Sequence, residues 1–361
     1  MGSTHTEYGH RPSLCHRRNT VVVEGRRLHV AHIVVTDAFA GVERYVSDVA
    51  AALARRGLAV TVIGGSRDGV APSVGHGVVW RAGSSPSVAA ASLARTRPDI
   101  VHSHMTTADG LAVALRAVHR APVVSTRHFA LPRGASRLGR IARPVVERGI
   151  TRDVAISNYV AASVGGRCAV IRNGVANAEF HRRPDHTVLV AQRLEREKQT
   201  GVALRAWAAS RLPSDGWRLV IAGRGACAPS LRALAAELGV RDSVEFRGFV
   251  SNLDELWAQA AALVATAPAE PFGLAVTEAM ARAIPVVAAA GGGHLETVGA
   301  VSHEWLFPPG DHEALQRLLD RLALSAAELE VYGRQLQQYQ RQEFSLEGHV
   351  DKLVDLYRGL R

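Results

Sequence analysis

Residues 28–65 read LHVAHIVVTDAFAGVERYVSDVAAALARRGLAVTVIGG. The two ends of this stretch, 28–35 and 59–65, are nearly continuous apolar runs rich in β-branched residues. The segment between them, 42–57, has apolar residues at helical spacing and stops at Gly57. Apolar runs without alternation are typical of strands covered on both faces, and a strand, a helix and a strand in this order join parallel neighbours. The stretch therefore predicts a parallel sheet with helices on both sides.

The same alternation continues along the chain in two series separated by a polar stretch. Further apolar runs of the first series lie at 99–104, 122–128, 152–157 and 168–174. The second series has its runs at 186–193, 217–223, 244–249, 262–267 and 285–290. Each series has the usual length of one domain, roughly 150 residues. We expect an α/β protein of two tandem, Rossmann-like, doubly wound domains.

The expected domain limits follow from these runs. A disordered tail (1–27) precedes the first domain (28–174), a linker (175–186) leads to the second domain (187–335), and a charged helix (336–361) packs back on the first domain. Ligands of open parallel sheets bind beyond the carboxyl ends of the strands. The cleft between the two domains is therefore the expected site.

Composition and charge exclude several classes of protein. The 361 residues are 47% hydrophobic with a net charge of +10, which favours phosphorylated ligands, polyanions or anionic membranes as partners. No apolar run is long enough to span a membrane, and the first 27 residues lack the apolar core of a secretory signal. Cys15, Cys168 and Cys227 are far apart, which fits a cytoplasmic protein without disulfides. Aromatic residues are only 5% and do not alternate with basic ones, so no nucleic-acid partner is expected.

The segment EPFGLAVTEAMARAIPVVAAAGGG (270–293) is the most informative about function. Glu270 follows an expected strand, the turn at 272–274 contains a glycine, and Glu278 lies on the helix that comes next. Gly273 would let the backbone approach a ligand closely. A carboxylate in a packed helix needs hydrogen-bond donors, and sugar hydroxyls are suitable ones. Either glutamate alone would be interpreted as a surface carboxylate, but the ordered set indicates a site.

This segment resembles the E-x7-E block of the retaining glycosyltransferases of family GT4, also called group 1, which have the GT-B fold. The resemblance covers the chain from about residue 28 and is stronger in the second half. It implies that Glu270 contacts the hydroxyls of the donor sugar and has a catalytic role, and that Glu278 holds the ribose of the nucleotide. It also implies a donor-binding role for the turn of Phe272, Gly273 and Leu274.

Arg193 and Lys198 flank the turn after the first strand of the second domain. Two cations here suit a diphosphate, although Glu195 and Glu197 between them also fit an ordinary charged loop. Lys198 is one of only two lysines, the other being Lys352. In GT4 an arginine and a lysine at these positions bind the pyrophosphate and stabilise the leaving group, so no metal or other cofactor is expected. The family often has glycine after this lysine, where this chain has Gln199.

Four further positions complete the expected site, and two of them, Gly41 and His128, take their roles from the resemblance. Gly41 follows the first strand, where many GT4 members have two glycines near the donor phosphate; an ordinary turn explains it equally well. His128 ends the strand at 122–128, and the family places a histidine there near the acceptor and the transferred sugar. Val250 lies where the base is recognised. Gly223 opens GRGACA (223–228), which mimics a dinucleotide fingerprint but falls in the second unit of its domain, so we interpret it as a tight turn lining the nucleotide site.

Two other features receive a plainer interpretation. His102 and His104 lie on one side of a strand, but no accompanying carboxylate spacing matches a metal site, so structural histidines are expected. The basic stretch 131–149 contains Arg133, Arg137, Arg140, Arg143 and Arg148 without a clean apolar face opposite. It is expected to be a solvated helix of the acceptor domain, with contact to an anionic acceptor or a phospholipid surface left open.

The sequence thus predicts a cytoplasmic, retaining, metal-independent glycosyltransferase of the hexosyltransferase type. Its donor would be a nucleoside-diphosphate sugar with UDP as the nucleotide, and its acceptor a hydroxyl of a small soluble natural product or aminocyclitol. The alternatives are a transferase acting on an envelope polysaccharide or a lipid-linked glycan, an NAD(P)-dependent oxidoreductase using 223–228, and a non-catalytic protein that binds sugar nucleotides.

Overall fold

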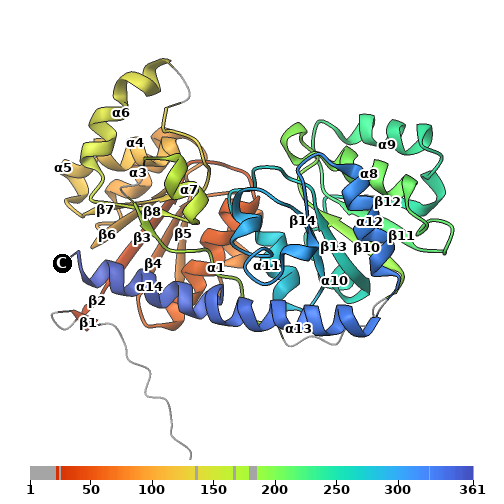
Figure 1. Cartoon of the computed structure of the whole chain (residues 1–361). Helices are drawn as coiled ribbons and strands as arrows, with labels where there is room; N and C mark the ends of the chain where they lie inside the picture. Colours follow the sequence, from red (N-terminus) through yellow and green to blue (C-terminus); the bar gives the residue numbers. More distant parts are fainter. Residues whose placement is uncertain are drawn as a thin grey trace, which may run out of the picture.

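The computed structural model describes residues 22–23, 26–134, 137–165, 168–178, 185–324 and 326–360. Two sheets, both parallel throughout, form the centres of two domains (Figure 1). The N-terminal sheet has the order β5 (Val78–Arg81), β4 (Ala59–Gly64), β3 (His29–Val34), β6 (Ile100–His104), β7 (Val123–Arg127), β8 (Arg152–Ala155) and β9 (Ala169–Val170). The C-terminal sheet has the order β12 (Val244–Gly248), β11 (Arg218–Ala222), β10 (Thr187–Ala191), β13 (Ala260–Ala265), β14 (Val286–Ala289) and β15 (Leu306–Phe307).

Helices cover both faces of each sheet, as the apolar strands predict. Five of the six residues of β3 are buried, and all five of β6 and of β7. The helices of the N-terminal domain are α1 (Gly41–Arg55), α2 (Arg67–Ser73), α3 (Pro86–Ala94), α4 (Thr106–Ala114), α5 (Arg116–His119), α6 (Arg137–Gly149) and α7 (Asn158–Ser163). Those that follow are α8 (Thr200–Ala209), α9 (Ala228–Glu237), α10 (Asp254–Gln259), α11 (Leu274–Ala281), α12 (His312–Leu322), α13 (Ala326–Glu343) and α14 (Leu346–Arg358). Among the described residues, no helix combines the length and the apolar character needed to cross a membrane.

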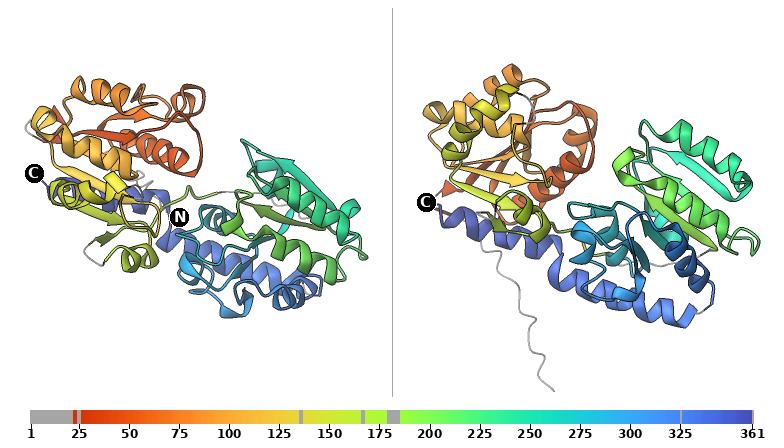
Figure 2. Two further views of the ribbon diagram at one scale, coloured as in Figure 1. Left: turned by 90° about the horizontal axis from the view of Figure 1, so that it is seen from above. Right: turned by 45° about the horizontal axis from the view of Figure 1, so that its top comes forward.

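The chain returns to the N-terminal domain at its end. Helix α13 packs on the C-terminal domain through Tyr332 and Leu336, and α14 then packs against α1 (Figures 1 and 2). The two segments that pass between the domains are hydrogen-bonded to each other. The Val175 N–H donates to the Phe344 carbonyl at 2.9 Å, and the Leu346 N–H donates to the Val175 carbonyl at 2.9 Å.

The expected domain limits can be placed on this architecture. The limit at 335/336 falls inside α13; Tyr332 and Leu336 of this helix and Phe344 directly after it belong to the C-terminal core. Of the expected tail, residues 1–21 lie outside the described residues, whereas β1 (Val22–Val23) pairs antiparallel with β2 (Arg26–Arg27). Half of the expected linker, residues 179–184, also lies outside them.

Candidate functional site

The ends of β10 and β13 hold the turn that carries Lys198. A 3₁₀ turn, Arg196–Lys198, follows β10, and the Lys198 carbonyl accepts hydrogen bonds from Thr266 Oγ1 at 2.6 Å and Gln192 Nε2 at 3.3 Å. The Lys198 ammonium donates to Glu270 Oε2 at 2.5 Å. These two side chains are 14% and 16% exposed, so the pair is largely shielded from water. The structure thus brings together two of the residues predicted to act on the donor.

The glycines after β14 let two loops approach each other. A Cβ on Gly292 would lie 2.3 Å from the Glu270 carbonyl oxygen, and the Gly293 N–H donates to that same oxygen at 2.7 Å. Gly292 also has a φ of +57°, a conformation that favours glycine. The loop after β14 therefore fixes the backbone of Glu270 and with it the carboxylate beside Lys198.

The turn at 272–274 supports the site mainly through its backbone. Phe272 was expected to bind the donor, but its side chain is 1% exposed and packs edge-on against Phe344 at 5.4 Å, so it is a core residue. Gly273 has a φ of +95° and precedes α11. Leu274 begins α11 and faces the N-terminal domain, where a Cβ on Gly41 would lie 4.0 Å from Leu274 Cδ1. We call the region around Gly41 and Leu274 the domain junction.

Glu278 lies on α11 near charges from both domains. Burial raises the pKa of its carboxyl, and Asp48 and Asp254 add to this, whereas Arg44 and Arg282 lower it. Arg44 and Asp48 belong to α1, on the other side of the domain junction. A carboxyl with a raised pKa and a nearby arginine is suited to hydrogen bonding with ligand hydroxyls.

Three predicted donor residues are placed differently from Lys198 and Glu270. Arg193 is 58% exposed and pairs with Glu197 at 2.8 Å, so it lies outside the contact between Lys198 and Glu270. Gly223 has a φ of +156°, and a Cβ there would lie 1.8 Å from the Gln192 carbonyl oxygen. This glycine packs its turn against the end of β10, as the interpretation of 223–228 as a tight turn requires. Val250 follows β12 and is half-buried.

His128 belongs to a group of buried histidines beneath α1 and α14. Its Nε2 lies 3.0 Å from Nδ1 of His104, and Nε2 of His104 lies 3.0 Å from Nδ1 of His32. His102 is bonded on both ring nitrogens, to Tyr357 at 2.5 Å and to Thr126 at 2.6 Å. The expectation of structural histidines fits these contacts, although His32, His102 and His104 have nitrogen atoms within 4.8 Å of one another.

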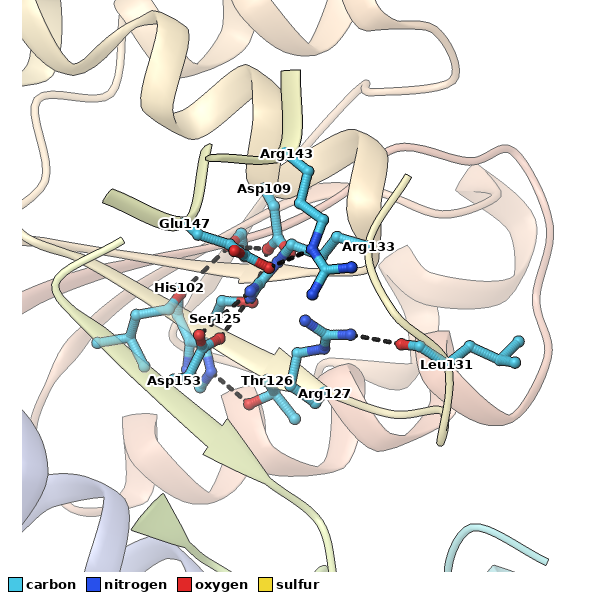
Figure 3. A network of polar contacts seen from close by, with 12 residues as sticks. His102, Asp109, Ser125, Thr126, Arg127, Leu131, Arg133, Arg143, Glu147 and Asp153 are labelled. Carbon is cyan, nitrogen blue, oxygen red and sulfur yellow. Dashed lines mark hydrogen bonds and ion pairs between the residues drawn. The ribbon is translucent and has the colours of Figure 1, made fainter. Parts of the chain in front are cut away.

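Arg133 holds the loop after His128 in place through buried ion pairs. It was expected to be one of the solvated arginines, and this expectation is wrong. Its guanidinium is 2% exposed; Nε donates to Asp109 at 2.6 Å, and the group also pairs with Asp153 (Figure 3). The hydroxyls of Ser103 and Ser125 both donate to Oδ1 of Asp109, at 2.6 and 2.7 Å, whereas Arg133 donates to Oδ2. Arg133 is therefore a structural residue.

Helix α6 is largely exposed and has a more amphipathic surface than expected. Ile141 and Val145 are 73% and 65% exposed and lie one turn apart. Arg137, Arg140 and Arg148 are exposed on the same helix.

Two residues of the site were missed. His294 is 1% exposed, and its Nδ1 donates to the Ala289 carbonyl at 3.0 Å; burial lowers its pKa, and Glu270 is close enough to oppose that shift. Glu296 accepts from the backbone N–H groups of Asn158 at 3.0 Å and Tyr159 at 2.7 Å, at the start of α7. The signal was the sequence directly after the three glycines, His294-Leu295-Glu296.

Two family models match this chain. The model described as "Glycosyltransferase Family 4" matches residues 39–179, and the model described as "Glycosyl transferases group 1" matches residues 161–339. The chain belongs to the group 1 glycosyltransferases. This confirms the family resemblance and the expectation of a glycosyltransferase, and it decides against an NAD(P)-dependent oxidoreductase.

Curated relatives of this glycosyltransferase carry varied names. Glycogen synthase of Mycobacterium tuberculosis is 31% identical over 231 residues, which is 56% of this chain and 54% of that protein. D-inositol 3-phosphate glycosyltransferase of Saccharomonospora viridis is 36% identical over 179 residues, 46% of this chain and 41% of that protein. Exopolysaccharide phosphotransferase SCO2592 of Streptomyces coelicolor is 35% identical over 149 residues, 41% of this chain and 16% of that protein. The glycosyltransferase thus matches about half or less of the length of each of these relatives.

Solved structures confirm the GT-B fold. HepE of Anabaena, in complex with UDP and glucose, has a TM-score of 0.78 at 18% identity, covering 92% of this chain and 100% of that chain. Sucrose-phosphate synthase of Thermosynechococcus elongatus has a TM-score of 0.74 at 21% identity, covering 92% and 99%.

Proposed function

We propose that this glycosyltransferase moves a sugar from a UDP-sugar to an acceptor hydroxyl with retention of configuration, in the cytoplasm. The observation that carries the proposal is the shielded contact between Lys198 and Glu270, which places a cation and a carboxylate at one point between the ends of β10 and β13. HepE, a structural neighbour, is solved with UDP-glucose, which supports UDP as the nucleotide here.

In the proposed reaction, the acceptor oxygen bonds to the anomeric carbon while the bond from that carbon to the diphosphate oxygen breaks. The electron pair of the broken bond leaves on the diphosphate, which also receives the proton of the acceptor hydroxyl. Lys198 stabilises the growing negative charge, and exposed Arg193 adds positive potential at the entrance. Glu270, released from Lys198 when the diphosphate binds, accepts hydrogen bonds from the sugar hydroxyls.

Glu278 would hold the ribose hydroxyls, whereas Glu270 would contact the transferred sugar. Substitutions of these two residues should therefore affect different steps, nucleotide binding for Glu278 and turnover for Glu270. Glu278→Gln should weaken UDP binding, measured by calorimetry. Glu270→Ala should lower kcat by more than it weakens UDP binding. Wild-type activity in both variants over a panel of UDP-, GDP- and dTDP-sugars would contradict the assignment.

The acceptor we propose is a hydroxyl of a small soluble compound such as an aminocyclitol. The match to D-inositol 3-phosphate glycosyltransferase, whose name contains a cyclitol acceptor, supports this class. A second candidate, a lipid-linked or envelope saccharide, is favoured by the exposed Ile141 and Val145 beside arginines on α6. Incubation of the enzyme with labelled UDP-sugar and either cyclitols or detergent-dispersed lipid saccharides separates the two classes by which product becomes labelled.

The same assay tests the proposed independence from metal. With Lys198 and Arg193 supplying positive charge, transfer should continue in excess EDTA. Loss of transfer in EDTA, restored by Mg²⁺ or Mn²⁺, would contradict this part of the proposal. Mass spectrometry of the product and its anomeric NMR signal would show whether configuration is retained.

A further inference from the structure

Three buried histidines connect the edge of the N-terminal sheet with its interior. His128 follows β7, His104 ends β6 and His32 lies in β3, and we call these three residues the histidine chain. The ring nitrogens of adjacent members are 3.0 Å apart at both contacts. His32 and His104 are fully buried, whereas His128 is 7% exposed and its Nδ1 makes no hydrogen bond within the described part of the chain. Nδ1 of His128 is thus the end that can meet a ligand.

All three rings are neutral at pH 7. Burial lowers the pKa of His32 and of His128 to about 3, and it lowers the pKa of His104 well below its ordinary value. A neutral imidazole has one N–H and one accepting nitrogen. Because His104 uses both of its nitrogens, the proton on His104 decides the direction of both hydrogen bonds. The three rings therefore have only two arrangements that make both bonds.

The two arrangements differ at the ends of the histidine chain. In the first, His32 and His104 both donate from Nδ1, so His128 accepts on Nε2 and keeps its proton on Nδ1. In the second, every proton is on Nε2. Nε2 of His32 is buried and has no hydrogen-bond partner among the described residues. The second arrangement would thus leave an N–H buried without an acceptor, and such orphaned N–H groups are rare in proteins.

We propose that His104 and His32 are positioning residues that hold His128 as the tautomer protonated on Nδ1, so that its outward nitrogen is a hydrogen-bond donor. This proposal rests on the proposed function, in which His128 faces the transferred sugar or the acceptor. His128 then donates to a ligand oxygen and, while the histidine chain is intact, does not accept a proton from it. The preference of His128 for an accepting ligand oxygen is therefore determined by His104 and His32, which lie behind it in the sheet.

The surroundings of the histidine chain agree with three neutral, hydrogen-bonded rings rather than with a metal site. His102 stacks on His104 at 4.6 Å, but Tyr357 and Thr126 occupy both of its nitrogens. Tyr45 lies edge-on to His128 at 5.1 Å and bonds to His349, whose Nδ1 donates to the Arg172 carbonyl. None of these neighbours brings a carboxylate or thiolate to balance a divalent cation.

Nitrogen NMR of the wild-type protein tests the tautomer directly and needs no substrate. With ¹⁵N-labelled histidine, the signals lost in His128→Gln identify His128. We expect its Nδ1 to carry the proton at pH 7. A proton on Nε2, or a rapidly exchanging mixture, would overturn the proposal, as would one equivalent of bound metal that disappears in His104→Leu.

Two substitutions of His32 add a test that a merely structural role would fail. Asparagine places an N–H donor close to the former Nδ1, so His32→Asn should keep the Nδ1 tautomer of His128 and near wild-type kcat/KM. Aspartate offers only acceptors to Nε2 of His104, so His32→Asp should draw the protons of His104 and His128 to Nε2 and lower kcat/KM about three- to tenfold, the worth of one neutral hydrogen bond. His119→Gln is the control, because His119 is also a buried histidine of this domain but bonds to the backbone of Ala112 and Ala121.

Equal losses of kcat/KM in His32→Asn and His32→Asp, with the His128 tautomer unchanged in both, would reduce His32 to a packing residue. The proposed function fails separately. If the wild-type protein neither binds UDP nor transfers sugar, that proposal is wrong, while the NMR experiment still decides the tautomer.

Discussion

The ammonium of Lys198 and the carboxylate of Glu270 form an ion pair, in which each neutralises the charge of the other. Their contact of 2.5 Å holds the ammonium and the carboxylate in place, since each side chain is less than one fifth exposed. A diphosphate would compete for the ammonium and a sugar hydroxyl for the carboxylate. Under the proposed function, a complete donor would replace both halves of the ion pair at once, whereas a nucleoside monophosphate without the sugar would replace neither fully.

Lys198→Ala should lower kcat/KM at least tenfold, because a charge-assisted contact to a leaving diphosphate contributes roughly 1.5–3 kcal/mol. Lys198→Arg should recover only part of this loss, since a planar guanidinium does not fit where a compact ammonium sat. Steady-state kinetics with varied UDP-sugar measures both. Lys352 is exposed on α14, so Lys352→Arg is the control and should have no effect. If substitutions at both lysines leave kcat/KM nearly unchanged, Lys198 does not contact the diphosphate.

Gln199 adopts a backbone conformation that favours glycine. Its φ is +50° and its ψ is 38°, and its side-chain oxygen is buried without a partner within the described residues. The family's preference for glycine here now has a physical reason. Gln199→Gly should be more stable than Gln199→Ala by about 1 kcal/mol, because alanine keeps the left-handed strain that glycine relieves. Urea unfolding at pH 7.5 measures the difference; an alanine variant as stable as the glycine variant would show that the strain is absent.

At the scale of elements, α7 joins the two domains through its first turn. Glu296 from the C-terminal domain accepts from two N–H groups of that turn, and Ser157 Oγ donates to the Pro271 carbonyl at 2.6 Å. A carboxylate at a helix N-terminus satisfies unpaired N–H groups and complements the helix dipole. Pro271 directly follows Glu270, so this contact also reaches the candidate donor site.

Glu296→Ala should lower the free energy of unfolding by about 1 kcal/mol, and Glu296→Gln by less, because the amide keeps one accepting oxygen. The alanine variant should also have a larger radius of gyration by X-ray scattering without ligand, since a contact between the domains is lost. Saturating UDP should reduce that difference. Unchanged stability and scattering in both variants would show that α7 and Glu296 do not hold the domains together.

Some features of the fold and of the candidate site could be predicted from the sequence, and others could not. The strands could be predicted because their apolar runs are continuous, and so could the positions of Glu270 and Lys198, because each follows such a run. The burial of Phe272 and Arg133 could not, because it depends on partners far along the chain, Phe344 and Asp153. The histidine chain joins three strands, and only the sheet order places His32 beside His104. The surface of α6 was misjudged because its exposed side depends on which face packs against α4.

For the whole molecule, the buried histidines predict acid sensitivity. The folded pKa is lowered to about 3 for His32 and His128 and to about 4 for His349, from 6.5 in an unfolded chain, and it is also lowered for His102 and His104. Between those values the unfolded state binds protons that the folded state excludes. Stability is therefore fully present only well above pH 6.5, and it falls as the pH drops through that value, by up to about 1.4 kcal/mol per pH unit for each histidine. Raised carboxyl pKa values at Asp48 and Glu278 oppose this only in part.

Urea unfolding at pH 5.5, 6.5 and 7.5 measures this dependence. We expect a loss of about 0.3 to 0.4 kcal/mol for each buried histidine from pH 7.5 to 6.5, and a steeper loss of about 1 kcal/mol for each from pH 6.5 to 5.5. His349→Gln, normalised to its own value at pH 7.5, should lose less on acidification than the wild type. A stability that stays constant to pH 5.5 would contradict the neutral, buried state of these rings.

The return of α14 to the first domain has a consequence for biosynthesis. Leu346, Val350, Leu353 and Tyr357 fill the same core as α1 and β3, so the N-terminal domain lacks part of its interior until residues 346–357 have left the ribosome. The nascent first domain would expose that apolar groove throughout translation of the second. A chain that ends at residue 345 should therefore be recovered in aggregates or bound to chaperones, whereas supplying residues 346–361 as a separate peptide should restore solubility.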